Sequence, residues 1–186
     1  MGGRGVKIIN SPFNTTIMTN LETFKTFLVS AAKAAIDAGA ILIFGQSGNS
    51  VSTTAFPNNK ARFVLLSFIG GNANKYPGKQ DKTKSYIATQ CTASVAPVGE
   101  NGQTETPVTV PLPIDFLTFV LLADGIQSDT VFDADVVPVV GYPNIRQFSN
   151  IKVGDIPATI SLAQADKLLK LGIQTPAKTG VGVPTT

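Results

Sequence analysis

The stretch at residues 19–44, TNLETFKTFLVSAAKAAIDAGAILIF, decides how the fold of this chain is interpreted. Thr19 and Glu22 have the spacing of a capping box, in which each side chain bonds the other residue's backbone N–H at a helix start. Gly39 can adopt the left-handed conformation that ends many helices. Between these signals, apolar residues recur at steps of three and four, the period of one helical face. They are Leu21, Phe24, Phe27, Leu28, Ala31, Ala35 and Ala38. The pattern predicts a helix near residues 20–38.

The five residues after this helix, at 40–44, are all apolar and do not alternate with polar ones. A run of this length suits a strand better than a helix. Because polar residues are absent from both faces, we expect the strand to be buried on both sides. Residues 45–50 then form a loop rich in Gly, Ser and Asn.

Small residues line the predicted helix, and Ala31, Ala35 and Ala38 share one face. Such a face lets a helix approach a sheet or another helix closely, so the ordinary interpretation is tight packing in the core. The alternative is an assembly interface along these three alanines, because an exposed apolar stripe would require a partner.

Short extended segments separated by turn residues fill most of the remaining chain. They are residues 6–9, 13–18, 51–56, 62–69, 85–95, 106–110, 136–140 and 151–153. Residues 72–84 form a polar loop. Residues 114–123 are apolar all round and fit either a buried strand or a helix, and their aromatic and β-branched content favours the strand. Ser161 and Gln164 form a second capping box, which predicts a helix near residues 162–171 that ends at Gly172.

This order of elements predicts an α+β fold, mainly antiparallel β of sandwich or barrel type, with two helices near the ends of the chain. The length of 186 residues suits one domain, which we assign to residues 1–176. Residues 177–186 contain mostly Gly, Thr, Val and Pro, and we expect a flexible or partner-docked tail.

Composition excludes several kinds of chemistry. The chain has no His, which excludes Ser-His-Asp and Cys-His hydrolases and His-ligated zinc sites. Its one cysteine, Cys91, cannot form a redox pair or a thiolate cluster. We therefore expect no enzyme activity, no catalytic residue, no cofactor and no metal. We also expect no membrane span and no secretory signal, because no apolar run is long enough for either.

Two clusters of charge are candidate binding sites. Four carboxylates lie close together in the sequence, at Asp124, Asp129, Asp133 and Asp135. They are interpreted as solvated loop charges or, alternatively, as a calcium site, which would need six or more convergent oxygens. Four lysines of the polar loop, near Tyr76 and Tyr86, are the best candidates for contact with an anion or with nucleic acid: Lys75, Lys79, Lys82 and Lys84.

Charged residues make up only 15% of the chain, below the usual ~25% of globular domains. Either neighbouring subunits cover much of the surface, or the surface is rich in Thr, Ser, Asn and Gln. The segment at residues 152–178, a strand, a turn and a capped helix, resembles small modules of tailed-phage structural proteins. The resemblance implies a virion subunit of capsid, tail or decoration type, made in the host cytoplasm, whose partners are copies of itself and other structural subunits. The alternative is a sandwich or OB-like module that binds single-stranded nucleic acid or carbohydrate.

Overall fold

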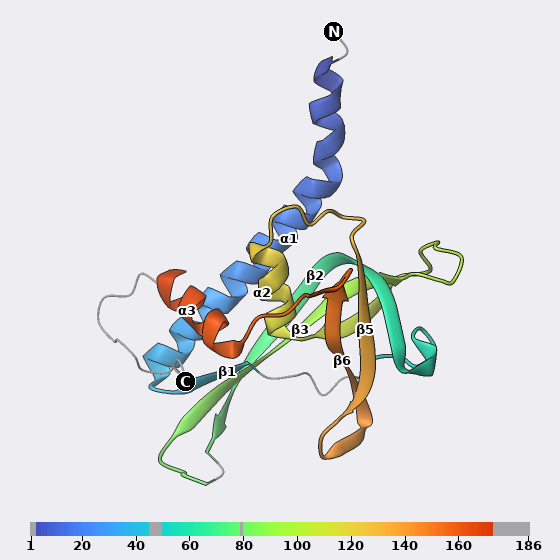
Figure 1. Ribbon diagram of the computed structural model, residues 1–186. Coiled ribbons are helices and arrows are strands. Elements are labelled where there is room, and N and C mark those ends of the chain that lie inside the picture. Colours follow the sequence, from blue (N-terminus) through green and yellow to red (C-terminus); the bar gives the residue numbers. More distant parts are fainter. Residues whose placement is uncertain (1–2, 45–49, 79, 173–186) are drawn as a thin grey trace.

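The fold combines one curled, mostly antiparallel sheet with helices gathered on one side of it (Figure 1). The computed structural model describes residues 3–44, 50–78 and 80–172. Seven strands form the sheet in the order β1-β3-β2-β5-β6-β7, and β4 pairs with β3 beside β1. The α+β class is confirmed, and the sheet curls into a half-barrel rather than a closed barrel. The described residues contain three α-helices, one more than the sequence predicted.

The elements follow one another in a simple order along the described chain. The helices are α1 (Gly3–Ala38), α2 (Ile114–Leu122) and α3 (Leu162–Gly172), with one 3-10 turn at Pro57–Asn59. The strands are β1 (Ile41–Phe44), β2 (Lys60–Pro77), β3 (Ser85–Pro97), β4 (Val108–Leu112), β5 (Val131–Val139), β6 (Tyr142–Val153) and β7 (Ile156–Pro157).

Helix α1 ends where the sequence predicted but begins much earlier. Gly39 has φ +63° and its N–H bonds the Ile36 carbonyl, while the Ala40 N–H bonds the Ala35 carbonyl. These are the two bonds of a Schellman motif. The strands predicted at residues 6–9 and 13–18 are wrong, because the helix runs through both. Extending an existing helix costs far less than starting one. The N-terminal part of α1 projects beyond the sheet (Figure 1).

Strand β1 is the predicted strand after α1, but it is not buried on both faces. It pairs in parallel with β3, from Ile41 opposite Tyr86 to Phe44 opposite Thr89. Leu42 is fully buried, whereas Ile43 is 40% exposed. β1 lies at an edge of the sheet. The face that carries Leu42 packs against the core, and the face that carries Ile43 contacts solvent. The strand predicted at residues 51–56 is also wrong, since this segment is a turn that leads into the 3-10 turn.

Strands β2 and β3 form the central hairpin, and both are longer than predicted. β2 continues past Gly70 and Gly71 to Pro77, so the first six residues of the predicted loop at residues 72–84 are strand. Two register shifts, between Leu65 and Ser67 and between Phe68 and Gly70, mark β-bulges in β2. Bulges bend a strand and let it continue, which explains why the two glycines do not end it.

Residues 114–122 form helix α2, so the preference for a strand is wrong. Pro113 precedes the helix, the Asp115 Oδ1 accepts from the Phe116 N–H, and Thr118 Oγ1 donates to the Ile114 carbonyl. α1 and the sheet bury most of the segment, and only Leu122 at its end is exposed, which explains why it shows little amphipathic period.

Helix α3 is confirmed, including its capping box. The Ser161 N–H donates to Gln164 Oε1 over 2.9 Å, and the Gln164 N–H donates to Ser161 Oγ over 3.1 Å. Each side chain satisfies a donor that the start of a helix leaves without a partner. Gly172 is the last helical residue that the structure describes, and the tail at 177–186 lies outside the described residues.

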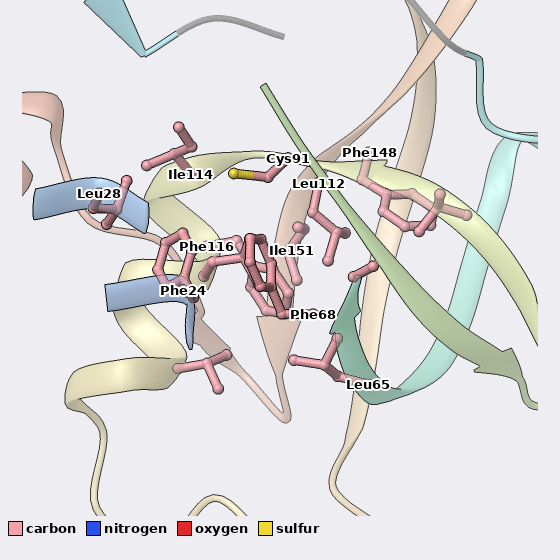
Figure 2. Packing of buried hydrophobic residues seen from close by; sticks show 14 of the residues in the cluster. Phe24, Leu28, Leu65, Phe68, Cys91, Leu112, Ile114, Phe116, Phe148 and Ile151 are labelled. Carbon is pink, nitrogen blue, oxygen red and sulfur yellow. The ribbon is translucent and has the colours of Figure 1, made fainter. Parts of the chain in front are cut away.

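The core lies between the helices and the concave face of the sheet. In Figure 2, Phe24 and Leu28 of α1 and Phe116 of α2 meet side chains of the strands. Phe63 lies at the centre of a ring cluster: it stacks on Phe148 with centroids 4.9 Å apart and also contacts Phe56, Phe116 and Phe132. This cluster joins β2, β5, β6 and α2 into one core.

Candidate interaction surface

The distal half of β2 has one edge that no described strand covers. β5 pairs with β2 only from Lys60 to Val64, while β3 pairs with the other edge as far as Pro77. Residues 72–77 are all exposed, and Ile69 and Tyr76 are 53% and 51% exposed. An open strand edge presents unpaired N–H and C=O groups to which another strand can bond.

The positions of those free backbone groups follow from the hairpin register. The Gly78 N–H bonds the Lys84 carbonyl over 2.9 Å, so residue 78 faces β3. The pairing runs without a shift from Gly70 opposite Thr92 to Pro77 opposite Ser85. Because hydrogen-bonded and non-bonded pairs alternate in an antiparallel ladder, Gly71, Ala73 and Lys75 direct their backbone groups to the free edge.

The structure places three of the four predicted lysines at or near the end of this hairpin. Lys75 is on β2, Lys82 and Lys84 follow in the connecting turn, and Lys79 lies outside the described residues. Asp81 organises the turn: its Oδ1 accepts from the Thr83 N–H and hydroxyl, and these bonds lower the pKa of the Asp81 carboxyl. Lys84 lies 3.9 Å from Asp81. The three described lysines are exposed and spread along the hairpin end rather than converging on one point.

The two tyrosines near these lysines lie directly opposite each other. Tyr76 of β2 pairs with Tyr86 of β3, so both side chains are on the same face of the hairpin. This is the face turned away from α1, because residues of the opposite parity, such as Ile87 and Thr89, are buried. The hairpin end therefore carries two tyrosines on one face, while Lys75, which pairs with Ile87, lies on the other face.

A second, charged surface lies on the outer face of β2, β5 and β6. Lys60 bonds Asp135 over 2.7 Å and Arg62 bonds Asp133 over 2.7 Å. Asn150 also donates to Asp135, and these hydrogen bonds, with Asn150 the larger cause, lower the pKa of that carboxyl. An open groove of about 1140 Å³ runs over this face. Cations and carboxylates alternate in it, so it offers no field of a single sign to a charged ligand.

The four predicted carboxylates do not come together. Asp124 and Asp129 are on the connection from α2 to β5, whereas Asp133 and Asp135 are on β5 and bond Arg62 and Lys60. Within residues 3–44, 50–78 and 80–172, no group of three or more His, Cys, Asp or Glu side chains could hold a metal ion.

The three alanines predicted as an assembly interface are divided between core and surface. Ala31 is 3% exposed and Ala35 is fully buried, and both pack in the protein's own core. Ala38 is exposed at the end of α1. Close packing accounts for the first two, so a partner could reach only Ala38.

Two buried titratable groups show no reactive environment. Cys91 is 1% exposed, and burial raises the pKa of its thiol to about 12. A thiol is a nucleophile only as the thiolate, so Cys91 is inert at neutral pH. The carboxyl of Asp115 has a raised pKa because it is desolvated beside α2. Neither group has a second titratable partner that the structure places beside it for acid–base chemistry.

The free edge of β2 is the feature that sequence reasoning missed. The sequence predicts that this strand ends at residue 69, but it continues through Gly70 and Gly71. Gly71 lies where α1 and β3 approach β2 closely. A Cβ there would lie 2.7 Å from the Phe27 ring and 2.8 Å from the Gln90 carbonyl oxygen. Residues 72–77 show no alternation of apolar and polar side chains, so the sequence contained no periodic signal that the strand continues.

Comparisons of this chain with protein-family models, with curated proteins and with solved structures find no match. None of the described helices is both long and apolar enough to cross a membrane.

Proposed function

We propose that this protein is a self-associating structural subunit of a virion-type assembly, such as a capsid, tail or decoration protein. One observation carries the proposal: the longest strand, β2, leaves an uncovered edge beyond Val64. A strand edge of this length is a liability in a monomer and becomes useful when another chain pairs with it.

Two further features support the same function. The N-terminal part of α1 also extends beyond the sheet, so both the longest helix and the longest strand reach away from the core (Figure 1). The low content of charged residues, 15%, suits a surface that other subunits cover.

The experiment is to purify the full chain and measure its mass by light scattering over a range of concentrations, followed by negative-stain imaging at the highest one. We expect the mass to rise with concentration and the images to show rings, tubes or shells. Dispersed monomers at every concentration would overturn the proposal.

A second candidate function is the binding of single-stranded nucleic acid at the hairpin end. The specific observation in its favour is the pair Tyr76 and Tyr86, which lie opposite each other on one face, with Lys84 two residues before Tyr86 in the chain. Aromatic rings flanked by cations are what single-strand binders use to stack bases and hold phosphates. The small excess of 15 basic over 12 acidic residues supports it only weakly.

A further inference from the structure

We propose that the free edge of β2 pairs with the same edge of a second copy, antiparallel and symmetric about Ala73. This inference rests on the proposed function and names the contact through which two subunits meet. In this register Ala73 lies opposite Ala73 of the other copy, Gly71 opposite Lys75, and Gly70 opposite Tyr76. The two sheets would join into one continuous sheet.

The backbone supports this register. Gly71, Ala73 and Lys75 all direct their N–H and C=O groups to the free edge, as the Gly78–Lys84 bond and the unbroken pairing show. A two-fold axis at Ala73 makes hydrogen-bonded pairs of Ala73 with Ala73 and of each Gly71 with Lys75 of the other copy, which gives about six new bonds. Pro77 has no N–H to donate, so the pairing ends there. Toward the N-terminus the bulge between Phe68 and Gly70 ends it.

The side chains fit the same register. Like charges directly opposite each other destabilise a sheet, and here each Lys75 faces a glycine rather than the other lysine. On the far face, Tyr76 faces Gly70, so an aromatic ring can cover the strand position that lacks a side chain. No Cβ atom can be added at Gly71 because the Phe27 ring lies there. Lys75 of one copy therefore reaches the Phe27 ring of the other, a cation–π geometry.

A second copy is the occupant that the observations favour over an unrelated strand. The exposed segment is complementary to itself, because the symmetric register places glycines opposite Tyr76 and Lys75. A strand of unrelated sequence would not in general have small residues at these two positions. A short strand pair buries less than a standard interface of ~1,600 Å², so we expect a weak dimer that further contacts reinforce in a larger assembly.

The test is disulfide cross-linking of the full chain under mild oxidation. In Ala73→Cys, the two thiols lie on residues about 5.5 Å apart between Cα atoms, within the range that a disulfide spans. Lys75→Cys is the matched control: it has the same parity and is also exposed, but its two copies are about 13 Å apart along the strand. The native Cys91 is buried and gives no background.

We expect Ala73→Cys to form a covalent dimer at least ~10-fold faster than Lys75→Cys, because Cα atoms more than ~7 Å apart cannot be bridged. Equal rates for the two variants would show random collision and overturn the pairing. Larger particles that form without any cross-link at residue 73 would also overturn it and leave the proposed function standing. Covalent dimers without larger particles would support the pairing and contradict the assembly.

A second measurement does not depend on cysteine chemistry. Ala73→Glu and Ala73→Lys each place two like charges at the symmetry axis, and a mixture of the two variants places opposite charges there. We expect each variant alone to dimerise roughly two- to fivefold more weakly than the mixture, in sedimentation at low salt. Identical dimerisation in all three samples would contradict the register.

Discussion

Phe63 shows how a single side chain joins several elements. It is fully buried, stacks on Phe148 and contacts three further rings from β5, α2 and the segment before β2. We expect Phe63→Ala to lower the free energy of unfolding by about 3–5 kcal/mol, because it removes these contacts and leaves a cavity. Urea unfolding measures the change. Val140→Ala is the control, since Val140 is 95% exposed and should change little; a loss below 1 kcal/mol for Phe63→Ala would contradict the described core.

Gly70 and Gly71 are neighbours, but only Gly71 lacks room for a larger side chain. A Cβ at Gly71 would lie less than 3 Å from the Phe27 ring and the Gln90 carbonyl, whereas a Cβ at Gly70 meets nothing within 4 Å. We expect Gly71→Ala to destabilise the protein by roughly 1–3 kcal/mol through overpacking. Gly70→Ala is the matched control and should be nearly neutral. Thermal unfolding at low protein concentration distinguishes them, and equal shifts in Tm would contradict the close approach of α1 to β2.

Asp115 makes stability depend on pH. Desolvation raises the pKa of its carboxyl in the folded protein, so the folded state binds more protons than the unfolded state in the acidic range. Stability therefore falls as pH rises from the unfolded pKa of ~3.9 through the folded one. We expect Asp115→Asn to have a higher Tm than wild type at pH 7 and the same Tm near pH 3. A lower Tm at pH 7 would show that charge at the start of α2 matters more than desolvation.

The end of α1 and the start of α3 were predictable, whereas the start of α1, predicted at the Thr19–Glu22 capping box, was wrong because the helix begins at Gly3. The capping box at Ser161 and Gln164 and the stop at Gly39 are both present, because they depend only on residues within one turn of the chain. Residues 114–122 were not predictable in this way. Their apolar pattern reflects burial by α1 and the sheet, and that burial comes from residues far away in the sequence.

The capping box gives a test of how much α3 contributes. Ser161→Ala removes the acceptor of the Gln164 N–H and should cost about 1 kcal/mol. Gln164→Ala removes the reciprocal bond, and the double variant should cost less than the sum, since the two bonds form one unit. Fully additive losses, measured by urea unfolding, would show that the two bonds are independent.

At the scale of the whole molecule, the α+β class with a mostly antiparallel sheet followed from the sequence, but the free edge and the parallel pair did not. Which strand pairs with which depends on long-range contacts that a periodic pattern does not contain. The Asn-rich end of β2 looked like a loop because its side chains are polar on both faces. That polarity reflects the exposure of the strand, and exposure is also what makes it the candidate interaction surface.

The lysines of the hairpin distinguish the two candidate functions. Changing Lys75, Lys79, Lys82 and Lys84 to Gln removes four positive charges without changing the fold. The control variant has four other lysines changed to Gln: Lys25, Lys33, Lys152 and Lys167. If the protein is a structural subunit, we expect both variants to lose the same retention on heparin, because both lose four positive charges and retention then depends only on net charge. A much larger loss in the hairpin variant would favour nucleic-acid binding.

The parallel pairing of β1 with β3 has a consequence for synthesis on the ribosome. β1 follows α1 immediately, yet its partner residues at 86–89 are translated only later. At about 5–20 residues per second, the apolar strand would wait on the order of seconds for that partner. The nascent chain must therefore keep Leu42 and Phe44 from other hydrophobic surfaces, so slower translation should lower the soluble yield and a bound chaperone should raise it.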